Sequence, residues 1–228
     1  MIFLWALLRL WFAVFLAGAA AIIAFAYLDH FMPFDLDRPP DFLTKHHLNL
    51  LKREPERCFA VLDRGKINYR PAPAFNNDRG CGYEDAVRLQ DSAVSYGSNP
   101  LLRCPAMLGL LLWQQHVLMP EAGAHFGKKL TAIRHLGTYA CRKIGGMRGR
   151  LLSQHASANA IDIAGFTLEG GESISLLRDW KESAEKGRFL RAVRDGACRI
   201  FGVTLSPDFN VAHANHFHFD MGTRSVCR

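Results

Sequence analysis

Apolar and polar residues repeat with different periods along the chain, which predicts helices in its first part and mostly strands in its second. Apolar positions on both sides of Pro55 indicate helix, and Gly65 is a stop signal. Residues 104–126 are apolar nearly all round, as expected for a buried core helix. Residues 187–202 also have helical spacing, and one side of that helix would carry Phe189, Leu190, Val193, Ala197 and Ile200.

Short runs of strand-forming residues lie between turn residues in the remaining sequence. Residues 160–168 and 173–177 flank the turn "EGGE", which is typical of an antiparallel hairpin. Further strands are expected at residues 66–71, 86–90, 129–142 and 216–221. Helices followed by mixed strands predict a single α+β domain with a central antiparallel sheet packed by helices.

The N-terminal residues 1–28 form a predicted transmembrane signal-anchor helix. No residue from Leu10 to Leu28 is charged, and at about 1.5 Å per residue this run approaches the hydrocarbon thickness of about 30 Å. A secretory signal usually has a shorter apolar core of about 7–15 residues. The length therefore favours an uncleaved anchor, although Ala24-Phe25-Ala26 would fit a cleavage site.

The residues on either side of this run indicate its orientation. Arg9 precedes it and Asp29, Asp35 and Asp37 follow it, which predicts a cytoplasmic N-terminus. Residues 29–50 read as a proline-rich linker and the start of the first helix, and residues 51–228 as the folded domain.

All six cysteines lie beyond the apolar run, and they have no CxxC spacing that would suit a cysteine-based zinc site. An even number of widely spaced cysteines after an export signal predicts three disulfides in an oxidising compartment. Pairing of neighbours in the sequence would give Cys58–Cys81, Cys104–Cys141 and Cys198–Cys227.

The formal net charge is +7. No run of Lys and Arg with interleaved aromatic residues suggests nucleic acid, and we expect no nucleic-acid partner. An exported basic chain suits an anionic envelope polymer or a membrane surface, and a generic basic surface is the alternative.

Two polar clusters interrupt the apolar pattern of the predicted strands. In residues 160–168, alternation places Asp162 on the face of Ala160 and Ala164. In residues 216–221, His216, His218 and Asp220 lie opposite Phe217 and Phe219. If the two strands are neighbours, one face gathers Asp162, His216 and His218. His155 has the wrong parity for this face and would have to reach it from the preceding loop.

Two histidines and one carboxylate form a three-ligand zinc site with an open fourth position, the arrangement of catalytic zinc. Zinc in such a site lowers the pKa of water to about 7 and polarises a carbonyl group. Asp220 is then either a support for a ligand histidine or an edge-strand residue. A histidine beyond the ligands can serve as the base or stabilise an oxyanion.

These motifs resemble those of known families. "SQHASANAIDIAGF", residues 153–166, resembles the SxHxxGxAxD signature of zinc D-Ala-D-Ala peptidases. "HANHFHFDMG", residues 213–222, resembles the terminal His-x-His of the group that contains lysostaphin-type peptidases, D-Ala-D-Ala peptidases and Hedgehog domains. Its His-x-x-His-x-His arrangement looks most like the penicillin-insensitive murein endopeptidase. Over residues 58–227, the cysteines and motifs together resemble the bacterial extensin-like C-terminal domain family.

The resemblance implies a role for each matching residue. His155, Asp162 and His218 would be zinc ligands, with His216 and His213 as the acid-base or transition-state groups. Ser153 would shape the loop or contact substrate. Arg142 would bind a substrate carboxylate bidentately, and a surface arginine is the alternative.

The chain departs from the signature at two places. Ala158 replaces the signature glycine, and no glutamate lies just before the last ligand. A histidine-based mechanism is therefore expected in place of a glutamate-based one.

The expected function is a zinc-dependent peptidase or amidase that hydrolyses peptidoglycan stem peptides, as a D-Ala-D-Ala carboxypeptidase or a murein endopeptidase does. The alternative is a non-catalytic wall-binding or protein-binding module that keeps the fold. We expect a single pass through a bacterial inner membrane, with the C-terminal domain in the periplasm.

Overall fold

The computed structural model describes residues 2–31, 34–146 and 150–228. The chain divides into two compact units, Met1–Asp35 and Leu36–Arg228. The first contains helix α1 (Ile2–Phe31), in which Trp5–Ala24 is long and apolar enough to cross a membrane, with a mean hydropathy of 2.2. A signal sequence near the N-terminus has the same properties, so the uncleaved anchor stays a prediction. Met32 and Pro33, within the predicted linker, lie outside the described residues.

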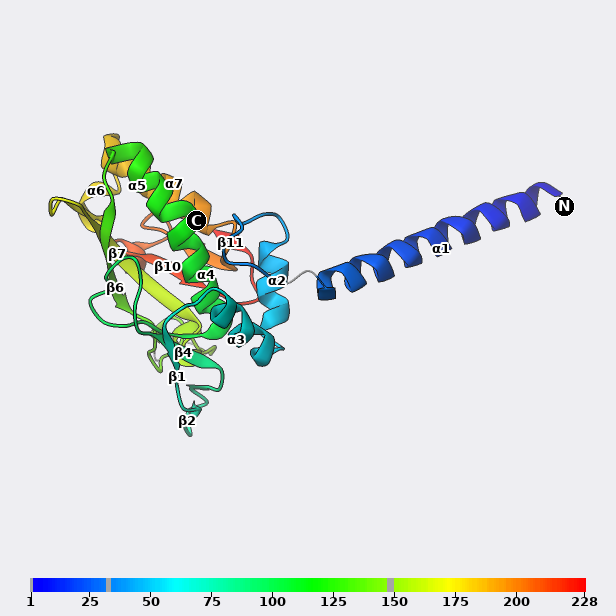
Figure 1. Ribbon diagram of the computed structural model, residues 1–228, viewed down its shortest axis with the longest axis horizontal. Coiled ribbons are helices and arrows are strands. Elements are labelled where there is room, and N and C mark those ends of the chain that lie inside the picture. Colours follow the sequence, from blue (N-terminus) through cyan, green and yellow to red (C-terminus); the bar gives the residue numbers. More distant parts are fainter. Residues whose placement is uncertain (1, 32–33, 147–149) are drawn as a thin grey trace. The chain divides into compact units, whose positions relative to one another are not determined.

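The second unit has an α+β fold, as predicted (Figure 1). Its helices are α2 (Thr44–Leu51), α3 (Pro55–Arg64), α4 (Cys104–Trp113), the π-helical turn η1 (Gln114–Leu118), α5 (Met119–Phe126), the 3-10 turn η3 (Gln154–Ser157), α6 (Leu176–Asp179), α7 (Glu185–Ala197) and the 3-10 turn η4 (Val211–His213). Its strands are β1 (Tyr69–Pro71), β2 (Phe75–Asn76), β3 (Gly82–Tyr83), β4 (Ala86–Leu89), β5 (Leu101–Arg103), β6 (Leu130–Gly137), β7 (Ala160–Leu168), β8 (Ser173–Ser175), β9 (Val203–Leu205), β10 (Phe217–Asp220) and β11 (Val226–Cys227).

The main sheet has the order β11-β9-β10-β7-β6, and β8 also pairs with β7. Apart from the parallel pair β11–β9, its neighbours are antiparallel. A smaller sheet has the order β1-β4-β5, and β2 pairs with β3 in a separate hairpin. The strands expected at residues 66–71 and 86–90 are confirmed as β1 and β4, but the β2–β3 hairpin between them was not predicted.

The predicted core helices cover one face of the main sheet. Trp113 of α4 packs edge-on against Phe219 of β10, with ring centroids 5.1 Å apart, and also contacts Phe166 of β7. Phe189 of α7 contacts the same Phe166, and Phe201 stacks on Phe219 at 4.9 Å. Every residue of α4 is buried. The five apolar residues predicted to share one side of the helix at residues 187–202 are buried too: Phe189, Leu190, Val193 and Ala197 of α7, and Ile200 just after it.

Some helix and strand boundaries differ from the sequence prediction. The helix predicted over residues 104–126 is interrupted by η1, a π-helical turn between α4 and α5. The strand predicted at residues 173–177 ends at Ser175, because α6 starts at Leu176. The strand predicted over residues 129–142 ends at Gly137, whose φ of +140° favours glycine. The segment that follows β6 leaves the sheet, and its Ala140 N–H bonds the His155 carbonyl of η3 at 3.1 Å.

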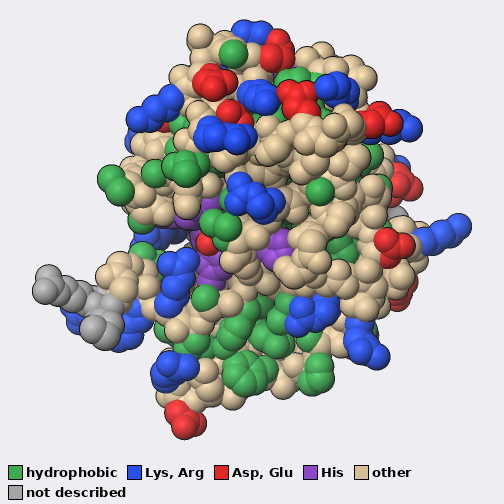
Figure 2. Space-filling view, turned by 90° about the vertical axis from the view of Figure 1, so that its left-hand side faces the viewer, with side chains coloured by type: hydrophobic (Ala, Val, Ile, Leu, Met, Phe, Trp, Pro, Cys, Tyr) green, Lys and Arg blue, Asp and Glu red, His purple; other side chains and the backbone are tan. Residues whose placement is uncertain are grey.

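Strand β7 is buried along nearly its whole length, on both of its faces. The side chain of Asp162 lies on the side of the strand where histidines gather. Figure 2 shows these histidines near the middle of one surface, with hydrophobic side chains below them and Lys and Arg side chains around them.

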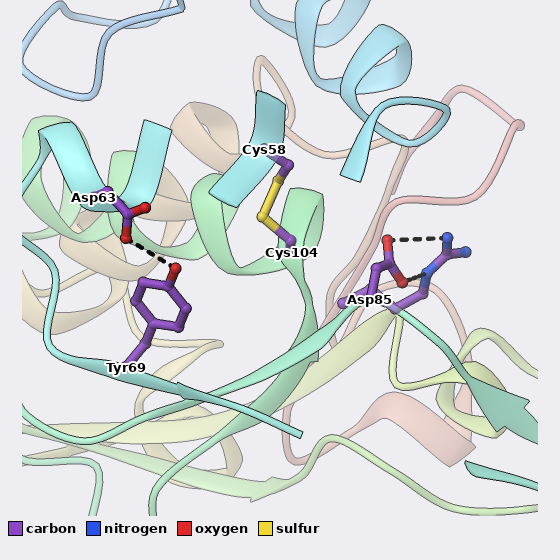
Figure 3. Close-up of a disulfide and its surroundings, with 6 residues drawn as sticks. Cys58, Asp63, Tyr69, Asp85 and Cys104 are labelled. Atoms are coloured by element: carbon purple, nitrogen blue, oxygen red, sulfur yellow. Dashed lines mark hydrogen bonds and ion pairs between the residues drawn. A yellow bond between two sulfur atoms is a disulfide. The ribbon is translucent and has the colours of Figure 1, made fainter. Parts of the chain in front are cut away.

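All six cysteines form disulfides, but two of the three predicted pairs were wrong. The bonds are Cys58–Cys104, shown in Figure 3, together with Cys81–Cys141 and Cys198–Cys227. Cys58 lies in α3 and Cys104 begins α4, and these helices pack together. Cys81 precedes β3 and meets the segment after β6. Tertiary packing thus joins cysteines that are not neighbours in the sequence, and only the Cys198–Cys227 prediction is confirmed.

Disulfide mapping tests this connectivity. Proteolysis of the oxidised full-length chain, with thiols blocked and no reductant, should release peptides that join Cys58 to Cys104 and Cys81 to Cys141. Mass spectrometry before and after reduction identifies the pairs. The Cys198–Cys227 peptide is the internal control, since both pairing schemes contain it. Recovery of a Cys58–Cys81 peptide would contradict the fold around α3 and the β2–β3 hairpin.

Candidate metal centre

The pairing of β7 with β10 brings the two polar clusters of the sequence together. The strands are antiparallel, and His218 lies directly opposite Asp162. Phe217 and Phe219 are fully buried on the core face, which confirms the alternation predicted for this strand. Because paired residues of a sheet point to the same face, the side chains of His218 and Asp162 meet on the other side.

His155 reaches this face from η3, the 3-10 turn that precedes β7. The Ser153 hydroxyl accepts a hydrogen bond from the backbone N–H of His155 at 3.3 Å and caps the turn. The prediction that His155 must enter from a loop is therefore confirmed.

His155, Asp162 and His218 form a compact triangle of buried polar atoms. His155 Nε2 lies 3.1 Å from Asp162 Oδ1 and 3.1 Å from His218 Nδ1. His218 Nδ1 lies 2.9 Å from the same Asp162 oxygen. Three potential ligand atoms from two strands and one turn thus lie close together.

The outer nitrogens of both histidines are held by neighbouring groups. His155 Nδ1 lies 3.1 Å from the carbonyl oxygen of Thr138, so this nitrogen carries a proton and donates it. His218 Nε2 lies 3.0 Å from Asp220 Oδ2 and donates likewise. Asp220 is itself fixed, because its Oδ1 accepts the N–H of Gly222 at 2.7 Å. In their neutral forms, both histidines therefore turn an unprotonated nitrogen towards Asp162.

Three electron-pair donors that face one another at about 3 Å need a positive charge between them. Burial would raise the pKa of Asp162, but its close contacts with His155 and His218 hold it well below its usual range. Burial would lower the pKa of His218, but its bonds to Asp162 and Asp220 raise it to about 9. The charge is thus either a proton on His218 or a cation in its place.

The donor set fits a zinc ion. Two imidazole nitrogens and one carboxylate oxygen are ligands that zinc accepts at about 2.0–2.2 Å, and tetrahedral ligands at that distance lie about 3.3 Å apart. The three separations in the triangle are close to that value. The Thr138 carbonyl and Asp220 carboxylate are outer partners of the kind that orient ligand histidines in metal sites.

His216 and His213 lie at the edge of the triangle and are only half-buried. His216 Nε2 is 3.7 Å from Asp162 Oδ1, and the His213 ring centroid is 5.2 Å from that of His216 and 5.9 Å from that of His218. The Nδ1 atoms of His213 and His216 bond the amide oxygens of Asn210 and Asn215 at 2.8 and 2.7 Å. In the neutral rings, both Nε2 atoms are consequently free to accept a proton.

Both of these edge histidines have a lowered pKa. Burial lowers the pKa of His213 to about 4, and the neighbouring His216 and His218 add to the effect. Burial also lowers the pKa of His216, against the opposing charge of Asp162. Near neutral pH both rings are therefore uncharged, the state in which a histidine can act as a base.

The remaining predicted residues lie around this centre. Arg142 is 57% exposed, and its guanidinium lies 3.8 Å from Asp162 Oδ2, so it borders the site from the loop after β6. Ala158 is fully buried at a φ of +51°, where the signature glycine would sit without strain. The loop keeps the left-handed conformation, and alanine there costs about 1–2 kcal/mol.

Three contributors were missed from the sequence. Thr138 acts through its backbone carbonyl, which has no side-chain signature. Asn210 and Asn215 each precede a site histidine, by three residues and one residue. An asparagine one to three residues before a histidine could have indicated a side chain that orients the histidine ring.

The sequence around this site matches a known protein family. A family model described as "Extensin-like protein C-terminus" matches residues 56–228, well over half of the chain. The chain belongs to this family. The match confirms the extensin-like resemblance, and it covers all three residues of the triangle. Comparisons with curated proteins and with solved structures found no match.

Zinc binding tests the triangle of this extensin-like domain. The full-length chain in detergent should bind about one zinc ion per molecule, as measured by metal analysis after dialysis. His155→Ala and His218→Ala should each abolish tight binding, because two ligands cannot hold the ion. His46→Ala, an exposed histidine of α2, is the matched control and should bind zinc normally.

The zinc affinity of the triangle should also depend on pH. Since the pKa of His218 is about 9 in the metal-free protein, its proton must leave before zinc binds. Apparent zinc affinity should therefore fall by about tenfold per pH unit as the pH decreases below 9, where one proton is released per ion. Full zinc binding by both histidine variants would refute the assignment.

Asp220→Asn tests the support of His218. The amide keeps the shape and can still accept the Gly222 N–H, but it removes the negative charge beside His218 Nε2. We expect zinc affinity to fall by about 10–100-fold, measured by competition with a chromogenic chelator. Asp78→Asn, an exposed carboxylate in the β2–β3 turn, should not change the affinity. Equal affinities in both variants would make Asp220 a purely structural strand residue.

Proposed function

We propose that this extensin-like domain is a zinc-dependent peptidase or amidase of the cell envelope that hydrolyses peptidoglycan stem-peptide bonds. The observation that carries the proposal is the buried His155–Asp162–His218 triangle with His213 and His216 at its edge. The resemblance of its two motifs to those of zinc D-Ala-D-Ala peptidases and of the murein endopeptidase supports the same reading.

His155, Asp162 and His218 would hold the zinc ion, which when bound activates a water molecule and polarises a substrate carbonyl. The outer partners Thr138 and Asp220 keep the two ligand rings in place. Asp162 remains ionised because of its two histidine neighbours.

His216 is the proposed proton acceptor. Its Nε2 faces Asp162 across 3.7 Å, while its Nδ1 is engaged by Asn215. The ring can take a proton at Nε2 and give it to the leaving amine, the two halves of general acid–base catalysis. His213 adjoins it and can exchange protons with it or stabilise the charge that develops on the substrate oxygen.

Arg142 is the proposed substrate clamp. Its guanidinium lies beside the triangle but is largely exposed, so it can reach an incoming group. Guanidinium binds carboxylates bidentately, and stem peptides carry free carboxylates. Ser153 has a structural role as the cap of η3, and we assign it contact with substrate only through the resemblance.

The proposed location is the periplasmic side of a bacterial inner membrane. Three disulfides indicate an oxidising compartment, and α1 supplies a candidate single-pass anchor. A wall polymer that carries negative charge suits the net charge of +7.

Hydrolysis of purified muropeptides tests the function. The full-length chain, loaded with zinc in detergent, should release peptide fragments that are resolved by liquid chromatography and mass spectrometry. His216→Ala should lower kcat by about 10²–10⁴-fold with zinc still bound, since it removes only the acid–base group. His155→Ala should lose both zinc and activity, and His46→Ala should behave as the unmodified chain.

The outcomes separate the alternatives. Binding of muropeptides with no turnover by the zinc-loaded chain would indicate a non-catalytic wall-binding module. Turnover that persists in His155→Ala and His218→Ala would exclude the triangle as the reacting centre.

A further inference from the structure

A cluster of three aromatic rings lies next to the candidate metal centre and has no role in it. Phe75 of β2, Tyr83 of β3 and Tyr139 after β6 form this cluster, which we call the aromatic platform. Tyr139 packs edge-on against both other rings, at 5.9 Å from Phe75 and 5.6 Å from Tyr83. Phe75 and Tyr83 are tilted towards each other at 5.9 Å.

None of these rings belongs to the hydrophobic core. Phe75 is 42% exposed, and Tyr83 and Tyr139 are half-buried. Grouping them at the surface leaves part of their apolar area in contact with water. Exposed apolar groups of this kind mark binding sites.

Hydrogen bonds on both sides of Tyr139 connect the platform to the metal centre. Tyr139 stands between Thr138, whose carbonyl bonds His155 Nδ1, and Ala140, whose N–H bonds the His155 carbonyl at 3.1 Å. Arg142 follows in the same segment and reaches Asp162. Figure 2 shows hydrophobic side chains directly below the histidines on one surface, in agreement with these bonds.

A disulfide and hydrogen bonds connect the segments that carry the platform. The Cys81–Cys141 disulfide joins the β2–β3 hairpin to the Tyr139 segment. The Asn77 side chain accepts the N–H groups of Arg79 and Cys81 at 3.0 and 3.1 Å and closes the hairpin turn. A Cβ at Gly82 would lie 2.2 Å from the Phe75 carbonyl oxygen, so only glycine permits this strand pairing. Preorganisation of this kind reduces the entropy lost on binding.

A cavity of about 400 Å³ opens beside the platform. Phe75 and Tyr83 supply apolar wall, and Asn76, Glu84 and Arg103 supply polar groups. Arg103 is held by Asp85, with Nε to Oδ1 at 2.5 Å and a second bond at 3.1 Å, and Figure 3 shows this pair at Asp85. The volume of the cavity lies within the range of small-molecule binding sites.

We propose that the aromatic platform and this cavity form a sugar-binding subsite that holds the glycan part of the substrate beside the metal centre. A pyranose ring has C–H groups on its faces and hydroxyl or amide groups around its rim. The rings of Phe75 and Tyr83 match those faces, while the amide, carboxylate and guanidinium of the cavity match the rim. A purely apolar peptide side chain would make no use of the Asn76 amide or the Glu84 carboxylate, which a sugar hydroxyl can bond.

This inference rests on the proposed function for its choice of glycan, and it makes that function more specific. The substrate would be a stem peptide still attached to its sugar, recognised at two points: the sugar by the platform and the peptide by Arg142. A free peptide would lose the first contact.

Calorimetric titration tests the subsite with three ligands: a disaccharide-tetrapeptide muropeptide, the same tetrapeptide without sugar, and the disaccharide alone. The protein is the full-length, zinc-loaded chain carrying His216→Ala, so that the ligands are not hydrolysed. The disaccharide-tetrapeptide should bind about tenfold more tightly than the free tetrapeptide, and the disaccharide alone should bind measurably.

Phe75→Ala, added to that background, should weaken binding of the disaccharide-tetrapeptide by several-fold to about tenfold. It should leave the dissociation constant of the free tetrapeptide unchanged. Phe42→Ala removes an aromatic ring that is 89% exposed outside the platform and should change neither value. Zinc content, measured in parallel, shows that Phe75→Ala remains folded around the metal centre.

Each outcome decides one of the two proposals. Equal affinity for the tetrapeptide with and without sugar would overturn the subsite, as would a Phe75→Ala effect of equal size on both ligands, which would identify a peptide-binding surface. Sugar-dependent binding together with no hydrolysis by the unmodified chain would refute the peptidase and keep the subsite. Hydrolysis at equal rates of the tetrapeptide with and without its sugar, together with equal affinity for both, would keep the peptidase and refute the subsite.

Discussion

The antiparallel pairing of β7 with β10 is the constraint on which both the core and the candidate metal centre depend. Its register places Phe219 opposite Ile161 and His218 opposite Asp162. A slip by one residue would turn His218 into the hydrophobic core and move Phe219 to the site. The rings of Trp113 and Phe201, which pack on Phe219, oppose such a slip. The packing of the core therefore fixes the position of the ligands.

The same pairing explains how a charged group tolerates burial. Asp162 lies in a strand that is covered on both faces, where an isolated carboxylate would be strongly unfavourable. Two histidines surround it, and each is bonded on its far side to Thr138 or Asp220. The outer polar atoms of this network therefore have hydrogen-bond partners. The three inner atoms, His155 Nε2, His218 Nδ1 and Asp162 Oδ1, face one another. A cation between these three atoms, or a proton on His218, is required there.

Much of the site could be predicted from sequence because strand alternation is local. The period of two assigned Asp162 and His218 to polar faces and Phe217 and Phe219 to the core, as the structure shows. The cysteine pairing could not be predicted in this way. It depends on how α3 packs against α4 and how the β2–β3 hairpin meets the segment after β6. The hairpin itself was missed because its strands are too short for a periodic pattern.

The sequence by itself determined the family, the α+β class, the apolar N-terminal helix and the candidate ligands, because motif spacing and side-chain periodicity are properties of neighbouring residues. Only the tertiary structure decided which nitrogen of each histidine faces Asp162, since that choice depends on Thr138, Asp220, Asn210 and Asn215. It also decided that an aromatic platform from three separate segments adjoins the centre. Contacts between distant segments follow from the packing of the whole domain, and no local pattern in the sequence records them.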